Sequence, residues 1–274
     1  MAHPAACVVG VDRQSGAMDV SPREPASEEW WAVPDLALSA RQIEQLQQLA
    51  ALLRDWNSRL NLISRQDMEA LERHHLTHAL LMAHLLPWAP RTRVLDVGTG
   101  GGLPGLPLAI AFPEVQFFLC DSVIKKTAAV SAMVEALGLK NVTVITKRAE
   151  TLESTWEFVI GRAVTALPNF LPWITKNLRP GGAPEFPNGV LYLKGTRYQE
   201  ELAALELAPW KVYDLSEATA DPYFVDKFLL HLRADDLIPR KDLYPAPPPP
   251  KKKAKKKKRR EVSRRKRDVW GEEA

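Results

Sequence analysis

The chain has 274 residues, which suits one α/β domain with appendages, and its 46% hydrophobic and 26% charged residues are typical of a globular protein. The longest uncharged run, residues 97–113, holds five glycines and three prolines and is therefore excluded as a membrane-spanning helix. Only Cys7 and Cys120 occur, which excludes a disulfide framework and a thiolate zinc site. Because the N-terminus also lacks a signal or transit pattern, we expect a cytoplasmic protein without a membrane span.

Charge is distributed unevenly along the chain. Residues 251–267 contain 13 Lys or Arg and one acid, whereas the rest of the chain contains 24 basic and 32 acidic residues. The sequence thus predicts a mildly acidic body with a cationic tail. Such a tail can attract a polyphosphate such as RNA, or an anionic membrane, and names neither by itself.

The composition predicts four segments. Residues 1–34 are rich in Pro, Ser and Ala without periodicity, so we expect a loose leader in which Trp30–Trp31 can dock on the body. We predict a helical segment over residues 35–90 and an α/β domain over residues 91–240. Residues 241–274 begin with a proline-rich spacer and continue into poly-Lys, which predicts a disordered basic tail.

Two helices are expected in the helical segment. Ser39 and Gln42 have the spacing of a capping box, and apolar residues then recur every three to four positions. This pattern predicts an amphipathic helix over residues 40–60. A second helix is expected over residues 68–86, ending before Pro87.

From residue 93 onward, short β-rich runs alternate with helical segments. We expect strands over residues 94–97, 115–120, 142–145, 158–160, 190–193, 212–215 and 228–232, with helices near residues 105–112, 124–137, 168–178 and 198–205. The helical segments are long enough for right-handed crossovers between parallel strands. The pattern predicts a doubly wound, mostly parallel, seven-stranded sheet whose late strands can be antiparallel.

The most informative stretch is Asp96–Gly105, with the sequence DVGTGGGLPG, in which a buried strand enters a glycine-dense turn. Missing Cβ atoms permit positive φ and let a ligand lie against the backbone. About twenty residues later a second apolar strand ends at Asp121, whose carboxylate can accept both hydroxyls of a ribose. The spacing predicts a site for a ligand with an adenosine-like ribose.

Asp96 decides which nucleoside cofactor we expect. Gly100, Gly102 and Gly105 also match the G-x-G-x-x-G pattern of dinucleotide sites, which is a weak signal alone. A carboxylate inside the strand, at the mouth of the loop, favours a sulfonium with an α-amino group and opposes a pyrophosphate. We therefore expect S-adenosylmethionine rather than NAD.

Together these motifs resemble the RsmG family, also called glucose-inhibited division protein B, over roughly residues 40–235. The likeness rests on Asp96–Gly105, Asp121-Ser122-x-x-Lys125-Lys126, Lys147-Arg148-Ala149-Glu150, Gly161-Arg162-Ala163, Trp56-Asn57-x-x-Leu60-Asn61-Leu62, Arg73-His74 and Leu193-Lys194-Gly195. The resemblance implies a class I (Rossmann-like) methyltransferase fold. It also implies methylation of a guanine N7 in bacterial small-subunit (16S) rRNA, either naked or in an assembling subunit.

The resemblance further implies cofactor contacts in the glycine loop and after the third and fourth strands, with the adenine near Ala149 and Glu150. Asp96, Gly100 and Asp121 are added from the residue pattern itself. The expected cofactor-binding residues are Asp96, Gly98, Gly100, Leu103, Asp121, Ala149, Glu150 and Arg162.

Several positions depart from the family pattern. The family continues Arg-His-x-x-Asp-Ser, whereas here Arg73-His74 is followed by Thr77-His78, so a carboxylate expected on the acceptor side is missing. Lys126 stands where Arg is common, which removes a planar guanidinium but keeps the charge. The stretch 182–189 is longer than usual. His74 and His78 have an i, i+4 spacing that can bind a metal, but no carboxylate-rich third ligand accompanies them, and no metal is expected.

No general base is required for the implied reaction. Guanine N7 has an in-plane lone pair and can attack a sulfonium methyl group without prior deprotonation. Catalysis then rests on positioning, and nearby carboxylates can stabilise the charge that develops on the purine. We expect no catalytic residue in the strict sense, with His74 and Arg162 as acceptor-side candidates.

Three other functions stay open. The chain could be a methyltransferase with another acceptor, a nicotinamide-dependent oxidoreductase that uses the loop Gly100–Gly105, or a silent RNA-binding factor that kept the fold. Asp96 and the lack of a Tyr-x-x-x-Lys proton-donor pair disfavour the oxidoreductase.

The cationic tail has three interpretations: an rRNA anchor, a targeting signal or an inert solvated segment. We favour the anchor, because Lys and Arg contacts to phosphate add salt-dependent, sequence-independent affinity. The RNA contacts are expected from Lys251, Lys252, Lys253, Lys255, Lys256, Arg259 and Arg260. We also expect the protein to be a monomer.

Overall fold

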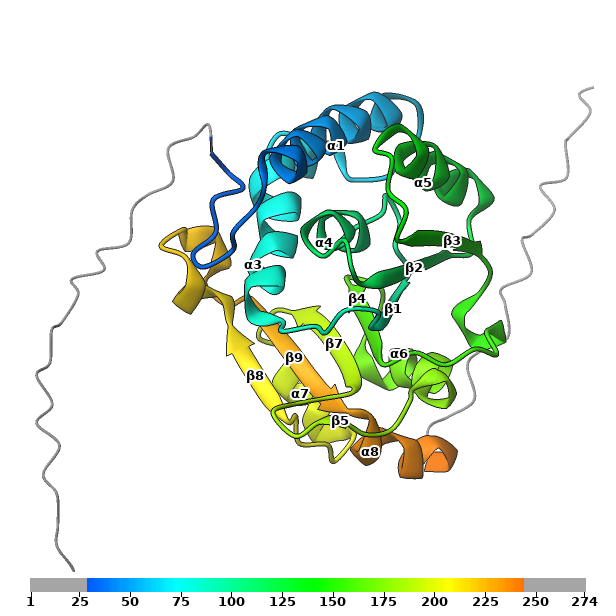
Figure 1. The fold of residues 1–274 in the computed structure, drawn as a ribbon. Helices are drawn as coiled ribbons and strands as arrows, with labels where there is room; N and C mark the ends of the chain where they lie inside the picture. The colour runs from blue at the N-terminus through cyan, green and yellow to red at the C-terminus, as the bar shows by residue number, and fades with distance from the viewer. Residues whose placement is uncertain (1–28, 244–274) are drawn as a thin grey trace, which may run out of the picture.

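The computed structural model describes residues 29–243, which wrap around one central sheet (Figure 1). The predicted basic tail lies outside these residues except for its first three positions, and the predicted leader lies outside except for residues 29–34. Thr77 Oγ1 donates a hydrogen bond of 2.8 Å to the carbonyl of Trp30, which fastens the start of the described chain to the helical segment. Both tryptophans are half-buried against the core, so the predicted docking is confirmed.

The first predicted helix is confirmed as α1 (Ala40–Arg59). Both arms of its capping box are present, because Gln42 N donates to Ser39 Oγ at 3.3 Å and Ser39 N donates to Gln42 Oε1 at 2.8 Å. These bonds satisfy backbone groups that a helix N-terminus otherwise leaves without partners. The buried face of α1 consists of Leu46, Leu49, Ala50 and Leu53.

The predicted helix over residues 68–86 is confirmed over residues 71–85, where helical turns are continuous, but it starts later than expected and is not a regular α-helix throughout. Three pieces occupy this region: α2 (Arg65–Met68), the π-helical segment η1 (Glu72–Thr77) and α3 (His78–Leu85). A π-helical turn contains an extra residue, so side chains that follow it are rotated relative to a regular helix. Apolar spacing alone does not reveal such an insertion, and the turn holds both His74 and His75.

The predicted doubly wound, mostly parallel sheet of seven strands is confirmed. Its order is β3-β2-β1-β4-β7-β9-β8, and β9 is the one strand of this sheet that runs opposite to the other six. The strands are β1 (Arg93–Val97), β2 (Gln116–Asp121), β3 (Val142–Thr146), β4 (Phe158–Arg162), β7 (Gly189–Lys194), β8 (Lys211–Asp214) and β9 (Phe228–Arg233). The strand order reverses between β1 and β4, and ligands of open α/β sheets bind beyond the strand ends at such a point.

Helices cover both faces of the sheet (Figure 1). On one face lie α1, α3, α4 (Gly105–Ala111) and α5 (Ile124–Ala136), and on the other lie α6 (Leu167–Ile174), α7 (Tyr198–Ala204) and α8 (Ala234–Leu237). Side chains of β1 alternate between the two cores, with Val94 in the first and Leu95 and Val97 in the second. This burial on both faces explains why consecutive residues of the strand, Val94 and Leu95, are both apolar.

The long stretch over residues 182–189 forms a small hairpin that the sequence did not predict. Its strands are β5 (Gly182–Ala183) and β6 (Phe186–Pro187), which pair antiparallel. Phe186 is buried and stacks on Phe158 with ring centroids 4.9 Å apart. The extra residues therefore pack near the start of β4 and β7, at the opposite end of the strands from the glycine loop.

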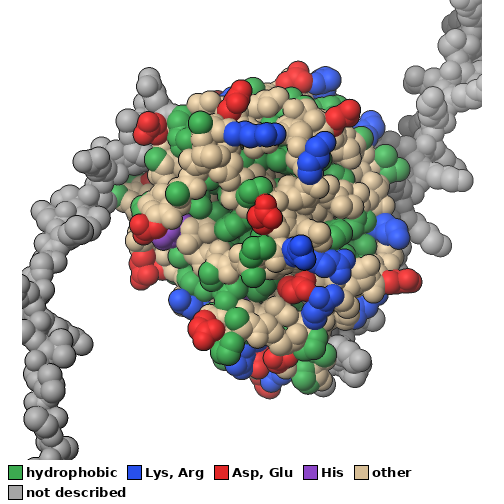
Figure 2. Space-filling view, in the orientation of Figure 1, with side chains coloured by type: hydrophobic (Ala, Val, Ile, Leu, Met, Phe, Trp, Pro, Cys, Tyr) green, Lys and Arg blue, Asp and Glu red, His purple; other side chains and the backbone are tan. Residues whose placement is uncertain are grey.

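Acidic and basic side chains alternate over the face seen in Figure 2, without one dominant cluster of either sign. No helix within the described residues 29–243 is long and apolar enough to cross a membrane. The charge pattern of this face is thus that of an ordinary hydrated surface.

Candidate active site

The glycine loop joins β1 to α4 at the switch point. Gly98, Gly100 and Gly102 have φ of 71°, 59° and 87°, a region that L side chains rarely adopt. The backbone N–H groups of Gly98 and Thr99 donate to the carbonyl of Cys120 at 2.8 and 3.1 Å, which ties the loop to the end of β2. Gly98 therefore exposes its backbone to solvent, whereas most of the other loop residues are buried.

Asp96 lies beneath this loop rather than at its mouth, with only 1% of its surface exposed. Its Oδ2 accepts hydrogen bonds from Gly105 N at 3.0 Å and from Thr99 Oγ1 at 2.7 Å. Its Oδ1 is buried without a hydrogen-bond donor. Burial raises the pKa of Asp96 to about 6, although the two hydrogen bonds and the charge of Arg162 oppose the shift.

Asp121 ends the neighbouring strand and is also anchored. Its Oδ2 accepts from Gly100 N at 3.1 Å, and its Oδ1 accepts from Val123 N at 2.9 Å. Both oxygens keep a second lone pair, so the carboxylate can accept further donors. The loop and the strand end are thereby fixed to each other on the side where a ribose was predicted.

Ala149 and Glu150 follow β3, in the short helix η2 (Ala149–Thr151). Ala149 is buried, and Glu150 accepts a hydrogen bond of 2.5 Å from Arg148 Nε. Lys176 Nζ donates to the carbonyl of Glu150 at 2.9 Å, which holds η2 in place. These two predicted residues therefore lie at the same edge of the sheet as the glycine loop and Asp121.

Leu103 differs from the other predicted residues because its side chain packs into the core, with 5% exposed. Its backbone N–H donates to the carbonyl of Thr99 at 2.9 Å. The peptide bond to Pro104 is cis. The Leu103 side chain thus anchors the loop in the hydrophobic core.

Arg162 ends β4 on the other side of the switch point. Its Nη2 lies 2.5 Å from His75 Nδ1, and its Nη1 donates to the carbonyl of His74 at 3.3 Å. Because a guanidinium only donates, His75 Nδ1 must accept, and the ring is neutral. Burial, assisted by the charge of Arg162, lowers the pKa of His75 to about 4.

A cleft of about 340 Å³ opens beside Arg162, over the ends of β4 and β7. Two of its residues, His74 and Arg162, were predicted from the sequence as acceptor-side candidates. The structure adds others that no motif flagged: Asp67, Tyr223 and Lys227. The spacing of Ser64 and Asp67 could have indicated a helix cap, but nothing in the sequence connects α2 with a cleft next to β4.

One carboxylate, Asp67, lines this cleft in the described part of the chain. It lines the same cleft as Thr165 and Lys194, although it comes from α2 rather than from the position after Arg73-His74. Thr77 instead binds the Trp30 carbonyl, and His78 is buried against Phe224 with ring centroids 5.6 Å apart. The Thr77-His78 replacement thus leaves the cleft with an acidic side chain.

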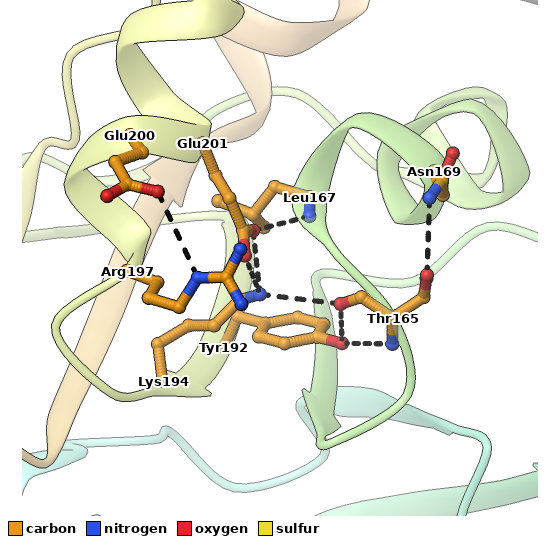
Figure 3. A network of polar contacts seen from close by, with 8 residues as sticks. All are labelled: Thr165, Leu167, Asn169, Tyr192, Lys194, Arg197, Glu200 and Glu201. Atoms are coloured by element: carbon orange, nitrogen blue, oxygen red, sulfur yellow. Dashed lines mark hydrogen bonds and ion pairs between the residues drawn. The ribbon is translucent and has the colours of Figure 1, made fainter.

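The loop after β4 is held by a polar network (Figure 3). Tyr192 OH donates to the carbonyl of Thr165 at 2.9 Å and accepts from Thr165 N at 3.1 Å. Lys194 Nζ pairs with both carboxylate oxygens of Glu201 at 2.8 and 2.7 Å, and Glu201 also accepts from Leu167 N at 2.7 Å. Strand β7 and helix α7 together fix the loop that begins at Arg162.

Two further features bear on function. Within residues 29–243, no group of three or more His, Cys, Asp or Glu side chains is arranged to hold a metal ion. A cavity of about 950 Å³ lies between Trp30–Pro34 and α1 and is lined by none of the predicted site residues. The chemistry therefore concentrates at the strand ends around the switch point.

The family described as rRNA small subunit methyltransferase G (GidB) matches residues 42–217. The chain belongs to this family. The match begins in α1, includes every strand from β1 to β8, and ends in the 3-10 helix η4 (Leu215–Ala218). It therefore covers the whole glycine loop and all eight predicted cofactor-binding residues.

Curated relatives agree with the family match. The chain is 45% identical to ribosomal RNA small subunit methyltransferase G of Flavobacterium johnsoniae, over 71% of this chain and 92% of that protein. It is 40% identical to the protein of the same name from Phocaeicola vulgatus, over 73% and 95%. A solved SAM-dependent methyltransferase from Aquifex aeolicus aligns at 15% identity, over 55% of this chain and 87% of that one, with a TM-score of 0.40. The family match confirms the expected family, and the order of the seven-stranded sheet confirms the expected doubly wound fold.

Proposed function

We propose that the protein transfers a methyl group from S-adenosylmethionine to N7 of a guanine in bacterial 16S rRNA. Family membership supports the reaction and the rRNA substrate. The observation that carries the cofactor assignment is the pair of anchored carboxylates at adjacent strand ends, Asp96 beneath the glycine loop and Asp121 beside it.

The residues present fit this cofactor better than a dinucleotide. The buried Oδ1 of Asp96 has no donor in the protein, and a buried acceptor of this kind is normally satisfied by a ligand group or an ordered water. A cationic α-amino group can provide donors, whereas a pyrophosphate would be repelled. Asp121 would accept from the ribose hydroxyls, with the adenine beside Ala149 and Glu150 and the bare backbone of Gly98 and Gly100 against the ligand.

Positioning accounts for the chemistry on the protein side. S-adenosylmethionine, when bound, supplies an electrophilic methyl group on its sulfonium. Arg162 belongs to the predicted cofactor set and also lines the cleft, so it lies at the boundary between the two halves of the site. His75 orients its guanidinium from one side and the His74 carbonyl from the other. A fixed boundary residue favours the alignment of acceptor and methyl group, which is worth several kcal/mol.

We expect transfer of labelled methyl groups from S-adenosylmethionine to small-subunit rRNA or to isolated subunits that lack the modification. Nucleoside analysis should recover the label as 7-methylguanosine. The Asp96→Ala variant should transfer no label, because the Asp96 carboxylate both holds the glycine loop and is the proposed partner of the cofactor's α-amino group. Calorimetry with S-adenosylmethionine and with NAD provides the binding control. Binding of NAD alone would overturn the assignment, and cofactor binding without any RNA labelling would redirect it to another acceptor.

The basic tail, which lies outside the described residues, is proposed to anchor the enzyme on rRNA. Deletion of residues 249–274 removes the cationic run and should weaken RNA binding and reduce its dependence on salt, since each phosphate contact releases counterions. Affinity for S-adenosylmethionine should not change, because every proposed cofactor contact lies in the described body. Binding measured at several salt concentrations tests this, and an unchanged slope contradicts the anchor. The cytoplasmic location and the monomeric state stay predictions.

A further inference from the structure

The cleft beside Arg162 is chemically different from the edge assigned to the cofactor. Seven of the eight proposed cofactor residues lie in or after β1, β2 and β3, whereas the cleft lies over β4 and β7, across the point where the strand order reverses; Arg162 is the one shared residue. Among the described residues that line it, Asp67 is the only carboxylate, and Arg162, Lys194 and Lys227 are cationic. Its volume of about 340 Å³ is at the small end of ligand sites, which suits a single base.

The carboxylate of Asp67 is oriented by one hydrogen bond, and its second oxygen accepts no hydrogen bond from a neighbouring side chain. Ser64 Oγ donates to Oδ2 at 2.6 Å, whereas Oδ1 lies 3.8 Å from His74 Nδ1, beyond hydrogen-bond distance. The bond from Ser64 lowers the pKa of Asp67, so the group is ionised at neutral pH. Its side chain is 45% exposed, which leaves Oδ1 open to a donor that enters the cleft.

Two stacked aromatic rings, those of His74 and Tyr223, line the same cleft as this carboxylate. His74 and Tyr223 are stacked with ring centroids 3.8 Å apart and an interplanar angle of 10°. Tyr223 is held from behind, because its backbone N–H donates to Asp221 Oδ1 at 2.8 Å and Asp221 pairs with Arg73. Flat side chains of this kind receive bases that have left a helical stack.

We propose that Asp67 selects guanine, by accepting hydrogen bonds from N1–H and the 2-amino group of the target base. This inference rests on the proposed function. Guanine is the one standard base that presents two adjacent donors on its Watson–Crick edge, and an ionised carboxylate is an acceptor-only group with two oxygens. The other bases place an acceptor where guanine has one of these donors and would face the carboxylate with a lone pair.

This contact also suits the reaction. N7 lies on the opposite edge of the purine from N1 and the 2-amino group, so a base held by Asp67 keeps N7 free. Methylation gives the purine a positive charge, and a fixed carboxylate stabilises that charge as it develops. Asp67 would therefore contribute to the transition state as well as to the choice of base.

A purely structural role for Asp67 is the competing interpretation. Ser64 caps α2 and accepts a hydrogen bond of 3.1 Å from Asp67 N, so Asp67 belongs to the helix cap. That role requires the backbone N–H and tolerates asparagine at the side chain. It predicts no connection between residue 67 and the 2-amino group of the substrate.

The test compares two rRNA substrates that differ only at the modified position, one with guanosine and one with inosine, which lacks the 2-amino group but retains N7 and N1–H. The wild-type chain should prefer guanosine about 10- to 100-fold in kcat/KM, the range for loss of a paired contact to a base edge. In Asp67→Asn the preference should fall to within about threefold, through a loss on guanosine. S-adenosylmethionine affinity should be unchanged.

Glu69→Gln is the matched control, because Glu69 is an exposed acid at the end of α2 that does not line the cleft. It should retain the full preference. A wild-type enzyme that forms 7-methylguanosine without discriminating inosine, or an Asp67→Asn variant that keeps the preference, overturns the inference and leaves the proposed function intact. Absence of 7-methylguanosine with wild-type protein overturns both.

Discussion

Replacement of Gly105 by alanine is expected to destabilise the protein by about 2 to 3 kcal/mol and to weaken S-adenosylmethionine binding roughly 100-fold. A Cβ at this position would lie 2.2 Å from Leu119 Cδ2 and 2.7 Å from Asp96 Oδ2. Both neighbours are buried, so relief requires movement of α4 away from β1 and β2. That movement breaks the 3.0 Å hydrogen bond from Gly105 N to Asp96 and releases the loop.

Urea unfolding and calorimetric titration measure the two effects. Gly138→Ala is the matched control: Gly138 has φ of 64° in the turn after α5, but a Cβ there would meet nothing within 4 Å. This control should cost only about 1 kcal/mol of backbone strain and leave cofactor affinity as it was. Equal behaviour of the two variants would show that the α4–β1 contact is not tight enough to fix the loop.

The sheet and the strand-end residues of the cofactor edge were predictable because both depend on local patterns. Apolar runs predict buried strands, and glycines at fixed spacing predict a turn next to the strand end. Asp96 and Asp121 are therefore placed by their positions directly in or after a strand. The burial of Asp96 was harder to predict, because it depends on how α4 packs over β1.

The cleft that we propose as the acceptor side was much less predictable, because its residues come from distant parts of the chain. Asp67 comes from α2, Arg162 from β4 and Tyr223 from the 3-10 helix η5 (Pro222–Phe224). The family resemblance indicated only Arg162 of these three, and no local motif connects Asp67 or Tyr223 with the cleft. The π-helical turn at Glu72–Thr77 adds to the difficulty, since one inserted residue changes the directions of His74 and His75. Family resemblance alone indicated that a carboxylate was absent there, and tertiary contacts supply one.

Replacement of Asp96 by asparagine should change how stability depends on pH. The pKa of about 6 in the folded protein lies above the ordinary value of 3.8, so folding disfavours the ionised carboxylate. This contribution favours the folded state fully below pH 4 and is lost as the pH rises to about 6, with a total of roughly 3 kcal/mol. Asparagine does not titrate, so the wild-type protein should lose about that much stability relative to the variant between pH 4 and pH 7.

Urea unfolding of both proteins across this pH range measures the difference, and saturating S-adenosylmethionine should reduce it in the wild type. A cationic partner for the buried Oδ1 favours the ionised form and therefore lowers the pKa of the bound protein. The variant should bind the cofactor more weakly although its free form is the more stable protein at pH 8. Such an exchange of stability for binding is typical of functional carboxylates that folding leaves without a full set of donors. Identical pH dependence of the unfolding free energy in both proteins would show that Asp96 has an ordinary pKa and does not lack a partner in the free protein.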